Sequence, residues 1–276
     1  MSRKIETLEE LHGYTLDALK FIDEVCRENN LTWFLSGGSA LGAVRHQGFI
    51  PWDDDADIMF PRADYERFLE IMAEREAQGR NGVYRFGSVH NRSDWTFPFA
   101  RVWNGNTRVV YQKLNEAPTG VFIDIYPMDG LPDSMLRTKL YYMRIRLLFF
   151  FLLCRIRKGF KDGEGKIAMK KLLAWLLKPV KPRSICACID RLARRRDFNK
   201  SNYVGCTVLS HYMERERFER RHFESMERLP FEGVDLPVPN GVDAYLRSLY
   251  GDYMTPPPAS AQNAGGHLME IYVDEA

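Results

Sequence analysis

A run of aspartates beside apolar residues limits how this chain can fold. Residues 53–57 read DDDAD, and the residues on either side, 49–52 and 58–60, are apolar. Charges held between two apolar segments favour the edge of a binding or catalytic site over a free loop, because the flanking residues have to be buried. The alternative interpretation is a solvated acidic turn.

The spacing of these aspartates predicts a cation site. If residues 55–58 form a strand, Asp55 and Asp57 point to the same face, because side chains alternate with a period of two. Asp53 has the same parity and can join them. Two such carboxylates repel each other, unless a divalent cation lies between them or one is protonated.

A further carboxylate, Asp124, occurs inside the apolar segment 121–126, which reads VFIDIY. A buried aspartate without a partner is costly, so this residue needs a counter-charge. A metal ion shared with Asp55 and Asp57 is the simplest explanation.

A glycine-serine turn precedes the acidic run. Residues 35–39 read LSGGS and are expected to end a strand and open a helix. Glycines such as Gly38 allow the backbone to approach a ligand closely, and the start of a helix offers free N–H groups to a phosphate. Ser39 can add its hydroxyl, and Arg45 can bind phosphate with two hydrogen bonds. The alternative is a turn with a structural role only, and we expect His46 to be a packing histidine.

Hydrophobic periodicity indicates that strands and helices alternate along the chain. This alternation predicts an α/β (α+β) fold with a mixed sheet. The segment 131–199 is expected to be mostly helical, with breaks at 163–165 and 179–182. We therefore predict a single catalytic domain, 1–276, in which 134–200 is a basic helical insertion and 201–276 returns to the core. Helices are predicted at 7–29, 40–46, 62–77 and 242–250, and strands at 31–35, 58–60, 83–86, 97–103, 108–111 and 121–126.

The net charge of +2 conceals a strong asymmetry. Residues 134–200 contain 19 Lys and Arg against 4 Asp and Glu, whereas the remainder contains 20 against 33. A basic segment on an acidic body indicates an anionic partner. In 140–158 and 170–178 the cations stand beside aromatic and aliphatic residues, which is typical of a helix lying on an anionic membrane surface. The alternative is a helical hairpin that packs on the core. No nucleic-acid-reading motif accompanies the basic residues, so no nucleic-acid partner is expected.

The longest apolar run, 147–154, has eight residues, whereas a membrane-spanning helix needs about 20. The first residues lack the apolar region of a signal peptide. The five scattered cysteines are typical of reduced thiols. These features predict a cytoplasmic protein.

Four sequence blocks together resemble the LicD family of the nucleotidyltransferase-fold superfamily, which includes fukutin and fukutin-related protein. GGSALGAVRHQGFIPWDDDADI resembles the first block of that family, and FIDIYPMDG resembles the second. RVWNGNT, which begins with Arg101, is similar to a stretch between them, and LYGDYMTPPP followed by His267 is similar to the C-terminal signature. The blocks span residues 11–267, whereas 134–200 contains no motif of the family.

The resemblance implies a nucleotidyltransferase-like mixed sheet flanked by helices, and a phosphotransferase of cell-surface glycan assembly. Members move a phospho-alcohol from a CDP-alcohol to a sugar hydroxyl of a teichoic acid, capsule or lipopolysaccharide precursor and release CMP. CDP-choline is the favoured donor, and a lipid-linked glycan is the expected acceptor. Such an enzyme is expected to be peripheral at the inner face of the plasma membrane.

The resemblance also implies roles for the site residues. Asp53, Asp55, Asp57 and Asp124 are expected to hold Mg²⁺ (or Mn²⁺), with Asp55, Asp57 and Asp124 catalytic. Asp124 can instead accept the proton of the attacking hydroxyl. The residues expected to contact the donor are Gly38, Ser39, Arg45, Arg101 and His267, although Arg101 suits a surface ion pair equally well.

Two other functions use the same residues. The same carboxylates serve a nucleotidyltransferase, in which attack on the α-phosphorus releases pyrophosphate instead of CMP. A non-catalytic membrane-bound scaffold is the third hypothesis, but such a protein has no need for charged residues in apolar strands.

Overall fold

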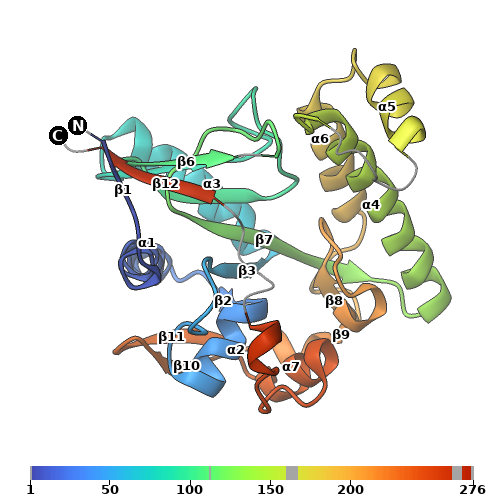
Figure 1. Ribbon diagram of the computed structural model, residues 1–276. Helices are drawn as coiled ribbons and strands as arrows, with labels where there is room; N and C mark the ends of the chain where they lie inside the picture. The colour runs from blue at the N-terminus through green and yellow to red at the C-terminus, as the bar shows by residue number, and fades with distance from the viewer. Residues whose placement is uncertain (1, 112, 160–166, 263–268, 275–276) are drawn as a thin grey trace.

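A mixed sheet of seven strands forms the centre of the protein (Figure 1). The structure is a computed structural model that describes residues 2–111, 113–159, 167–262 and 269–274. β3 and β7 run parallel, whereas their other pairings in this sheet are antiparallel. The predicted α/β class is therefore confirmed. Across the sheet the order is β2 (Phe34–Leu35), β3 (Asp57–Pro61), β7 (Phe122–Leu131), β5 (Ala100–Asn104) and β4 (Tyr84–Gly87), while β8 (Tyr203–Cys206) pairs with β7 and β9 (Phe218–Glu219) pairs with β8.

Two helices pack against the sheet, α1 (Leu8–Glu28) and α3 (Arg62–Ala77). α1 begins at Thr7, whose hydroxyl accepts a hydrogen bond from the Glu10 N–H at 3.2 Å. Such a cap satisfies one of the free donors at a helix start. The bounds of α3 are those predicted, and α1 differs from its prediction by one residue at each end.

A third helix, α2 (Gly37–His46), follows β2 directly and begins three residues earlier than predicted. It contacts β3, the hairpin strand β10 (Met226–Phe231) and α7 (Val242–Tyr250). β11 (Val234–Pro239) completes that hairpin. α2 is therefore enclosed by segments from the C-terminal third of the chain.

A smaller sheet joins the two ends of the described chain. β12 (Met269–Asp274) pairs with β1 (Ser2–Lys4) on one side and with β6 (Thr107–Tyr111) on the other, as Figure 1 shows near the N and C labels. Short 3₁₀ helices occur at η1 (Met213–Glu216), η2 (Arg220–Phe223) and η3 (Ala259–Ala261).

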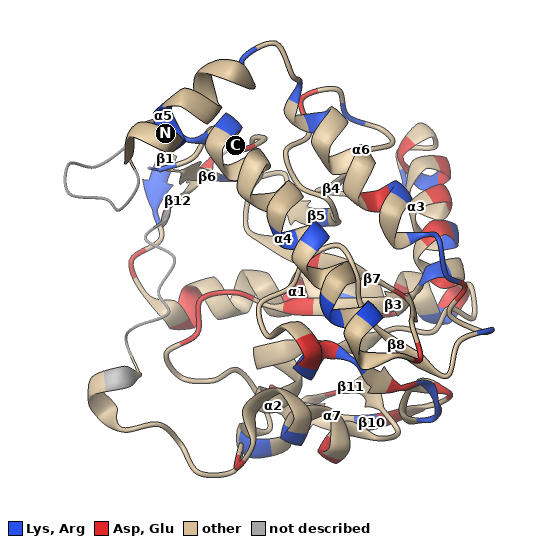
Figure 2. Cartoon of the chain, turned by 90° about the vertical axis from the view of Figure 1, so that its right-hand side faces the viewer, with Lys and Arg blue, Asp and Glu red and all other residues tan. Residues whose placement is uncertain are grey.

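The basic segment folds into three helices, α4 (Met135–Ile156), α5 (Ile167–Leu176) and α6 (Pro182–Ala193). α4 packs against both α5 and α6, and it lies on the side that faces the viewer in Figure 2. The predicted break at 179–182 is confirmed, because α6 begins at Pro182, whereas the predicted break at 163–165 lies outside the described residues. Within the described ranges, no helix is both long enough and apolar enough to cross a membrane.

The apolar side chains form two clusters. The larger lies between the sheet and α1, α2, α3 and α7, and it includes Trp33, Phe60 and Phe68. The second joins α4 and α6 to the segment around Trp95 and Trp103. The basic segment is therefore packed on the protein through an apolar core of its own.

Candidate active site

Asp57 and Asp124 lie side by side in the main sheet. They are register partners in the parallel pairing of β3 with β7. Asp57 is the first residue of β3, and Asp124 is buried in β7 between Ile123 and Ile125. Because partners across a strand pair point to the same face, the pairing brings these two predicted site residues together.

The three consecutive aspartates form a loop before β3. Asp53, Asp54 and Asp55 each place a carboxylate oxygen within 4.8 Å of the others. The loop is held through the Asp53 backbone, whose N–H donates to the Ile50 carbonyl (2.9 Å) and whose carbonyl pairs with the His12 ring (2.7 Å). Asp54 was not among the predicted ligands. Its place between Asp53 and Asp55 in the sequence was the signal that could have added it to the group.

The strand predicted at 58–60 is confirmed with one more residue at each end, but the condition of a strand over 55–58 is not met. β3 begins at Asp57, so Asp55 belongs to the loop and does not share a strand face with Asp57. Aspartate is poorly suited to strands, and three in a row keep the backbone out of the ladder. The loop, rather than strand alternation, brings Asp55 toward Asp57.

The four predicted carboxylates interact as one electrostatic unit. Burial raises the pKa of Asp57 well above its usual range. The charges of Asp55, Asp124 and Asp53, in that order, raise this pKa further, and Arg101 acts in the opposite direction. Asp57 therefore becomes negatively charged with difficulty, which is the expected behaviour of a carboxylate among like charges.

The glycine-serine turn lies directly against this acidic cluster. A Cβ atom on Gly38 would come within 2.7 Å of an Asp53 carboxylate oxygen, so only glycine fits without displacement. The Ser39 hydroxyl accepts a hydrogen bond from the Asp57 N–H at 2.9 Å. Gly37 has a φ of 51°, a left-handed conformation that suits glycine. The turn therefore links the start of α2 to the start of β3.

Arg101 is buried behind Asp124. Its Nε and one terminal nitrogen bind the two oxygens of Asp124, the second bond measuring 3.2 Å. Its other terminal nitrogen donates to the Tyr111 hydroxyl at 2.8 Å. The guanidinium carbon lies 3.7 Å from the ring centre of Phe97 and 3.8 Å from that of Phe122. Arg101 does form an ion pair, but the alternative of a surface ion pair is wrong, because its side chain is only 7% exposed.

The other residues expected to contact the CDP-alcohol donor are Arg45 and His267. Arg45, in the last turn of α2, donates to the Tyr253 carbonyl at 2.8 Å. It thus joins α2 to the YGDYM segment of the C-terminal signature. His46 stands edge-on to Trp52, with ring centres 6.1 Å apart, as expected for a packing histidine. His267 lies outside the described residues.

Three tyrosines border the acidic cluster. The Tyr245 hydroxyl accepts a hydrogen bond from the Gly37 N–H at 2.8 Å and contacts the Ser36 hydroxyl at 3.2 Å. Burial raises the pKa of Tyr250, as do nearby groups that include Asp57. Tyr126 donates to Asp124 at 3.4 Å. Tyr245 was missed by sequence reasoning, although it lies on the apolar side of the correctly predicted helix 242–250.

The donor set fits a hard divalent cation. Asp53, Asp55, Asp57 and Asp124 offer only carboxylate oxygens, which are the ligands that Mg²⁺ and Mn²⁺ prefer. The raised pKa of Asp57 shows that the cluster disfavours a further negative charge, and a bound cation would relieve this repulsion.

The chain is similar to known proteins over this region and beyond it. A family model described as the LicD/FKTN/FKRP nucleotidyltransferase domain matches residues 30–149, which contain the acidic cluster, Arg101 and Asp124. The lipopolysaccharide cholinephosphotransferase LicD of Haemophilus influenzae is 27% identical over 275 residues, 97% of this chain and 98% of that protein.

Two shorter matches concern uncharacterized proteins. One, from Rickettsia typhi, is 39% identical over 61 residues, which are 22% of this chain and 20% of that protein. The other, from Rickettsia prowazekii, is 39% identical over 66 residues, 24% and 25% of the two chains. The domain match and the nearly full-length similarity agree with the four sequence blocks: the chain matches the LicD domain over residues 30–149 and is similar to a LicD protein over almost its whole length.

Proposed function

We propose that the protein is a phosphotransferase that moves a phospho-alcohol from a CDP-alcohol to a sugar hydroxyl, with release of CMP. Phosphocholine is the favoured group, because the relative that aligns with 97% of the chain is named a lipopolysaccharide cholinephosphotransferase. The acceptor is proposed to be a lipid-linked precursor of a cell-surface glycan such as lipopolysaccharide, teichoic acid or capsule.

One observation carries this proposal. The strand register places Asp57 beside Asp124, and the loop of Asp53–Asp55 meets them at the start of β3. A glycine-serine turn that opens a helix lies against the same carboxylates. Carboxylates beside a glycine-rich helix start suit a substrate with a metal-bound pyrophosphate.

Asp53, Asp55, Asp57 and Asp124 are the residues that would hold Mg²⁺ or Mn²⁺. The bound ion would neutralise charge on the pyrophosphate of the donor. Asp124 accepts hydrogen bonds from Arg101 on both oxygens and from Tyr126 on Oδ2, so the remaining lone pair of Oδ1 is the one that can face an ion. Arg101 therefore orients this carboxylate for either of its proposed roles, ion binding or acceptance of the proton from the sugar hydroxyl.

The turn is proposed to contact the donor phosphates. The Ser39 oxygen already accepts the Asp57 N–H, so its own hydrogen is available to a phosphate oxygen. Gly38 exposes backbone at the same place, because the residue has no side chain to separate the backbone from a ligand.

A nucleotidyltransferase is the second candidate, because the family model carries that description. The same carboxylates serve both reactions. The released product separates them, since attack at the β-phosphorus of the donor releases CMP and attack at the α-phosphorus of a nucleotide releases pyrophosphate.

The test is thermal stabilisation by CDP-choline, CDP-ribitol, CDP-glycerol and CTP, each with and without Mg²⁺. A ligand at a hundred times its dissociation constant adds about 2.7 kcal/mol of stability. We expect a Mg²⁺-dependent shift with one CDP-alcohol that exceeds the shift with CTP, followed by CMP release when a glycan acceptor is added. A shift with CTP alone, together with pyrophosphate release, would replace the phosphotransferase by the nucleotidyltransferase.

A further inference from the structure

The long helix α4 has two apolar faces, and only one of them is covered. Tyr142, Ile145 and Leu152 are buried, and they lie on the face that packs on α6 and the second core. On the opposite face a stripe remains exposed. Its members follow each other at intervals of four, three and four residues: Leu136 (67% exposed), Leu140 (45%), Met143 (57%) and Leu147 (53%).

The next helix, α5, is almost entirely an apolar surface helix. None of its described residues is buried. Four large side chains are exposed, namely Met169 (43%), Leu172 (55%), Trp175 (69%) and Leu176 (54%). Most helical stability in proteins comes from covering an apolar face, and among the described residues α4 covers only one side of α5. We refer to these four residues and the four of the α4 stripe as the α4–α5 face.

Cations border the apolar stripe of α4 on both sides. With 3.6 residues per turn, Arg137 and Arg144 fall on one side of the stripe. Lys139 and Arg146 fall on the other side, where Lys139 forms an ion pair with Glu214 of η1 at 3.2 Å. α5 adds Lys170 and Lys171, and neither helix contains an Asp or Glu. Figure 2 shows blue segments recurring along α4 with α5 near its upper end.

We propose that the α4–α5 face binds the surface of an anionic lipid bilayer. An apolar stripe between rows of Lys and Arg inserts at the boundary of acyl chains and headgroups, while the cations reach the anionic headgroups. An exposed tryptophan is typical of that boundary. A second copy of the chain is a poorer occupant, because the two cationic borders would then face each other.

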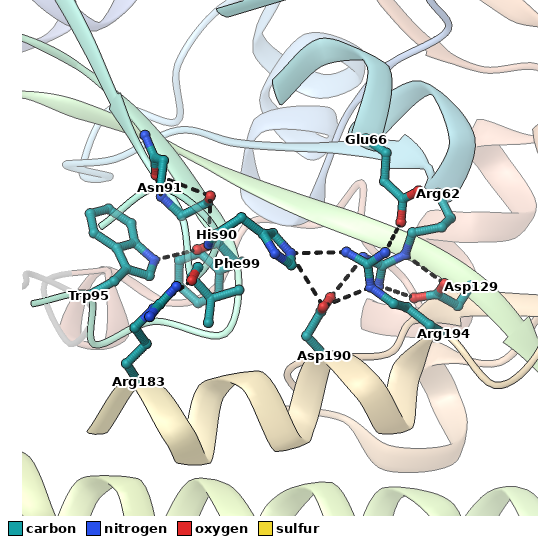
Figure 3. A network of polar contacts seen from close by, with 12 residues as sticks. Arg62, Glu66, His90, Asn91, Trp95, Phe99, Asp129, Arg183, Asp190 and Arg194 are labelled. Carbon is teal, nitrogen blue, oxygen red and sulfur yellow. Dashed lines mark hydrogen bonds and ion pairs between the residues drawn. The ribbon is translucent and has the colours of Figure 1, made fainter. Parts of the chain in front are cut away.

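The helix α6, against which α4 packs, is joined through Arg62 to the strand that carries Asp124. Arg62, at the start of α3, donates to Asp190 of α6 at 2.9 Å and to both oxygens of Asp129 at 2.8 and 2.6 Å (Figure 3). Arg194 of the same segment also binds Asp190, at 2.7 Å. Asp129 belongs to β7, as Asp124 does. Binding through α4 and α5 therefore holds the acidic cluster at a constant position relative to the lipid surface.

The test is sedimentation of the full chain with vesicles of equal parts phosphatidylglycerol and phosphatidylcholine, compared with vesicles of phosphatidylcholine alone. The apolar variant is Leu140→Gln with Leu147→Gln, and its matched control is Val83→Gln with Met226→Gln, which are exposed elsewhere at 38% and 42%. The charge variant is Arg137→Gln with Arg144→Gln. Its control, Lys20→Gln with Arg67→Gln, removes two exposed cations from α1 and α3.

We expect the wild type to bind the anionic vesicles and to bind phosphatidylcholine at least about tenfold more weakly. The charge variant should bind about 30-fold more weakly and the apolar variant at least about tenfold, with both controls near wild type. A blue shift of tryptophan emission on binding should be smaller in Trp175→Phe.

Three outcomes would overturn the proposal. The first is no binding to the anionic vesicles by a folded wild type. The second is equal binding by the apolar variant and its control. The third is a dimer in solution that Leu140→Gln with Leu147→Gln dissociates, without vesicle binding, because the face would then be an interface between copies. None of these outcomes depends on the proposed transferase activity.

Discussion

Asp57 at the start of β3 and Asp124 within β7 are direct partners across two adjacent parallel strands. Neighbouring strands lie about 4.8 Å apart, so this register brings the two carboxylates within reach of one ligand. The same closeness helps raise the pKa of Asp57, after burial and the charge of Asp55. In the protein without a bound cation, the two carboxylates therefore repel each other.

Asp57→Asn should lower turnover at least about 100-fold while the protein stays folded. The amide keeps the shape of the side chain but removes one of several like charges, so the free energy of unfolding should stay equal or rise. CMP release and a thermal melt measure the two effects. Asp17→Asn, an exposed position on α1, is the control and should change neither. Near-full activity of the variant would show that Asp57 has no part in the site.

Gly38→Ala should reduce activity and stability together. The added Cβ would meet the Asp53 carboxylate at 2.7 Å, so that side chain has to move away from the cluster. We expect a small cost in stability, below about 1 kcal/mol, because the clashing atom is the end of a side chain that can rotate, and a larger loss of activity, because that side chain is a proposed ion ligand. The matched control is Gly13→Ala, where a Cβ meets nothing within 4 Å inside α1. That change should stabilise the protein by about 0.5–1 kcal/mol. Urea unfolding compares them, and equal effects would contradict the close approach at Gly38.

Arg101→Met should destabilise the protein strongly, by about 3–5 kcal/mol, because it leaves Asp124 buried without its counter-charge. The Phe97 and Phe122 rings would keep contact with the new side chain, so the loss reports mainly on the ion pair. Arg67→Met removes an exposed ion pair with Glu70 instead and should cost less than about 1 kcal/mol. A small loss at Arg101, measured by denaturant unfolding, would mean that solvent reaches Asp124.

Stability should fall between pH 4 and pH 2 through Asp190. Burial by itself would raise the pKa of this carboxyl, but the hydrogen bond with His90 and the charges of Arg62 and Arg194 outweigh it and lower the pKa from 3.8 to about 2. A carboxyl with a lowered folded pKa stabilises the protein above its unfolded pKa, and this contribution is lost as the pH falls through the folded value. It amounts to about 2 kcal/mol.

Asp190→Asn should therefore be less stable than the wild type at pH 7, and the difference should shrink below pH 4. Unfolding by urea at pH 7, 4 and 3 measures it. A difference that stays constant over this range would mean that Asp190 does not stabilise the protein through its charge.

Local patterns predicted most of the helices. The helices 62–77 and 242–250 have the predicted bounds, and 7–29 differs by one residue at each end. Amphipathic spacing and caps such as Thr7 act within a few residues, so they can be seen in the sequence. Strand starts were less accurate: the strand predicted at 31–35 begins at Phe34, and the one predicted at 97–103 begins at Ala100. Pairing with a neighbouring strand, rather than a local pattern, decides where a strand begins.

The partners of the site residues required the folded chain. Arg101 binds Asp124 from the next strand, and Tyr245 reaches the glycine-serine turn across more than 200 positions of sequence. No spacing rule connects such positions, because chain topology, rather than local periodicity, brings them together. The same holds for the network of Arg62, Asp129 and Asp190.

The sequence alone determined the α/β class, the acidic run and the basic character of 134–200, because composition and short-range periodicity are properties of neighbouring residues. Only the tertiary structure decided which face of α4 is buried. Of the two predicted alternatives for this segment, packing on the core holds for the face of Ile145, whereas contact with a membrane stays a proposal for the exposed face of Leu140. Apolar residues of a helix look alike in sequence, and burial depends on which of them meets a partner from elsewhere in the chain.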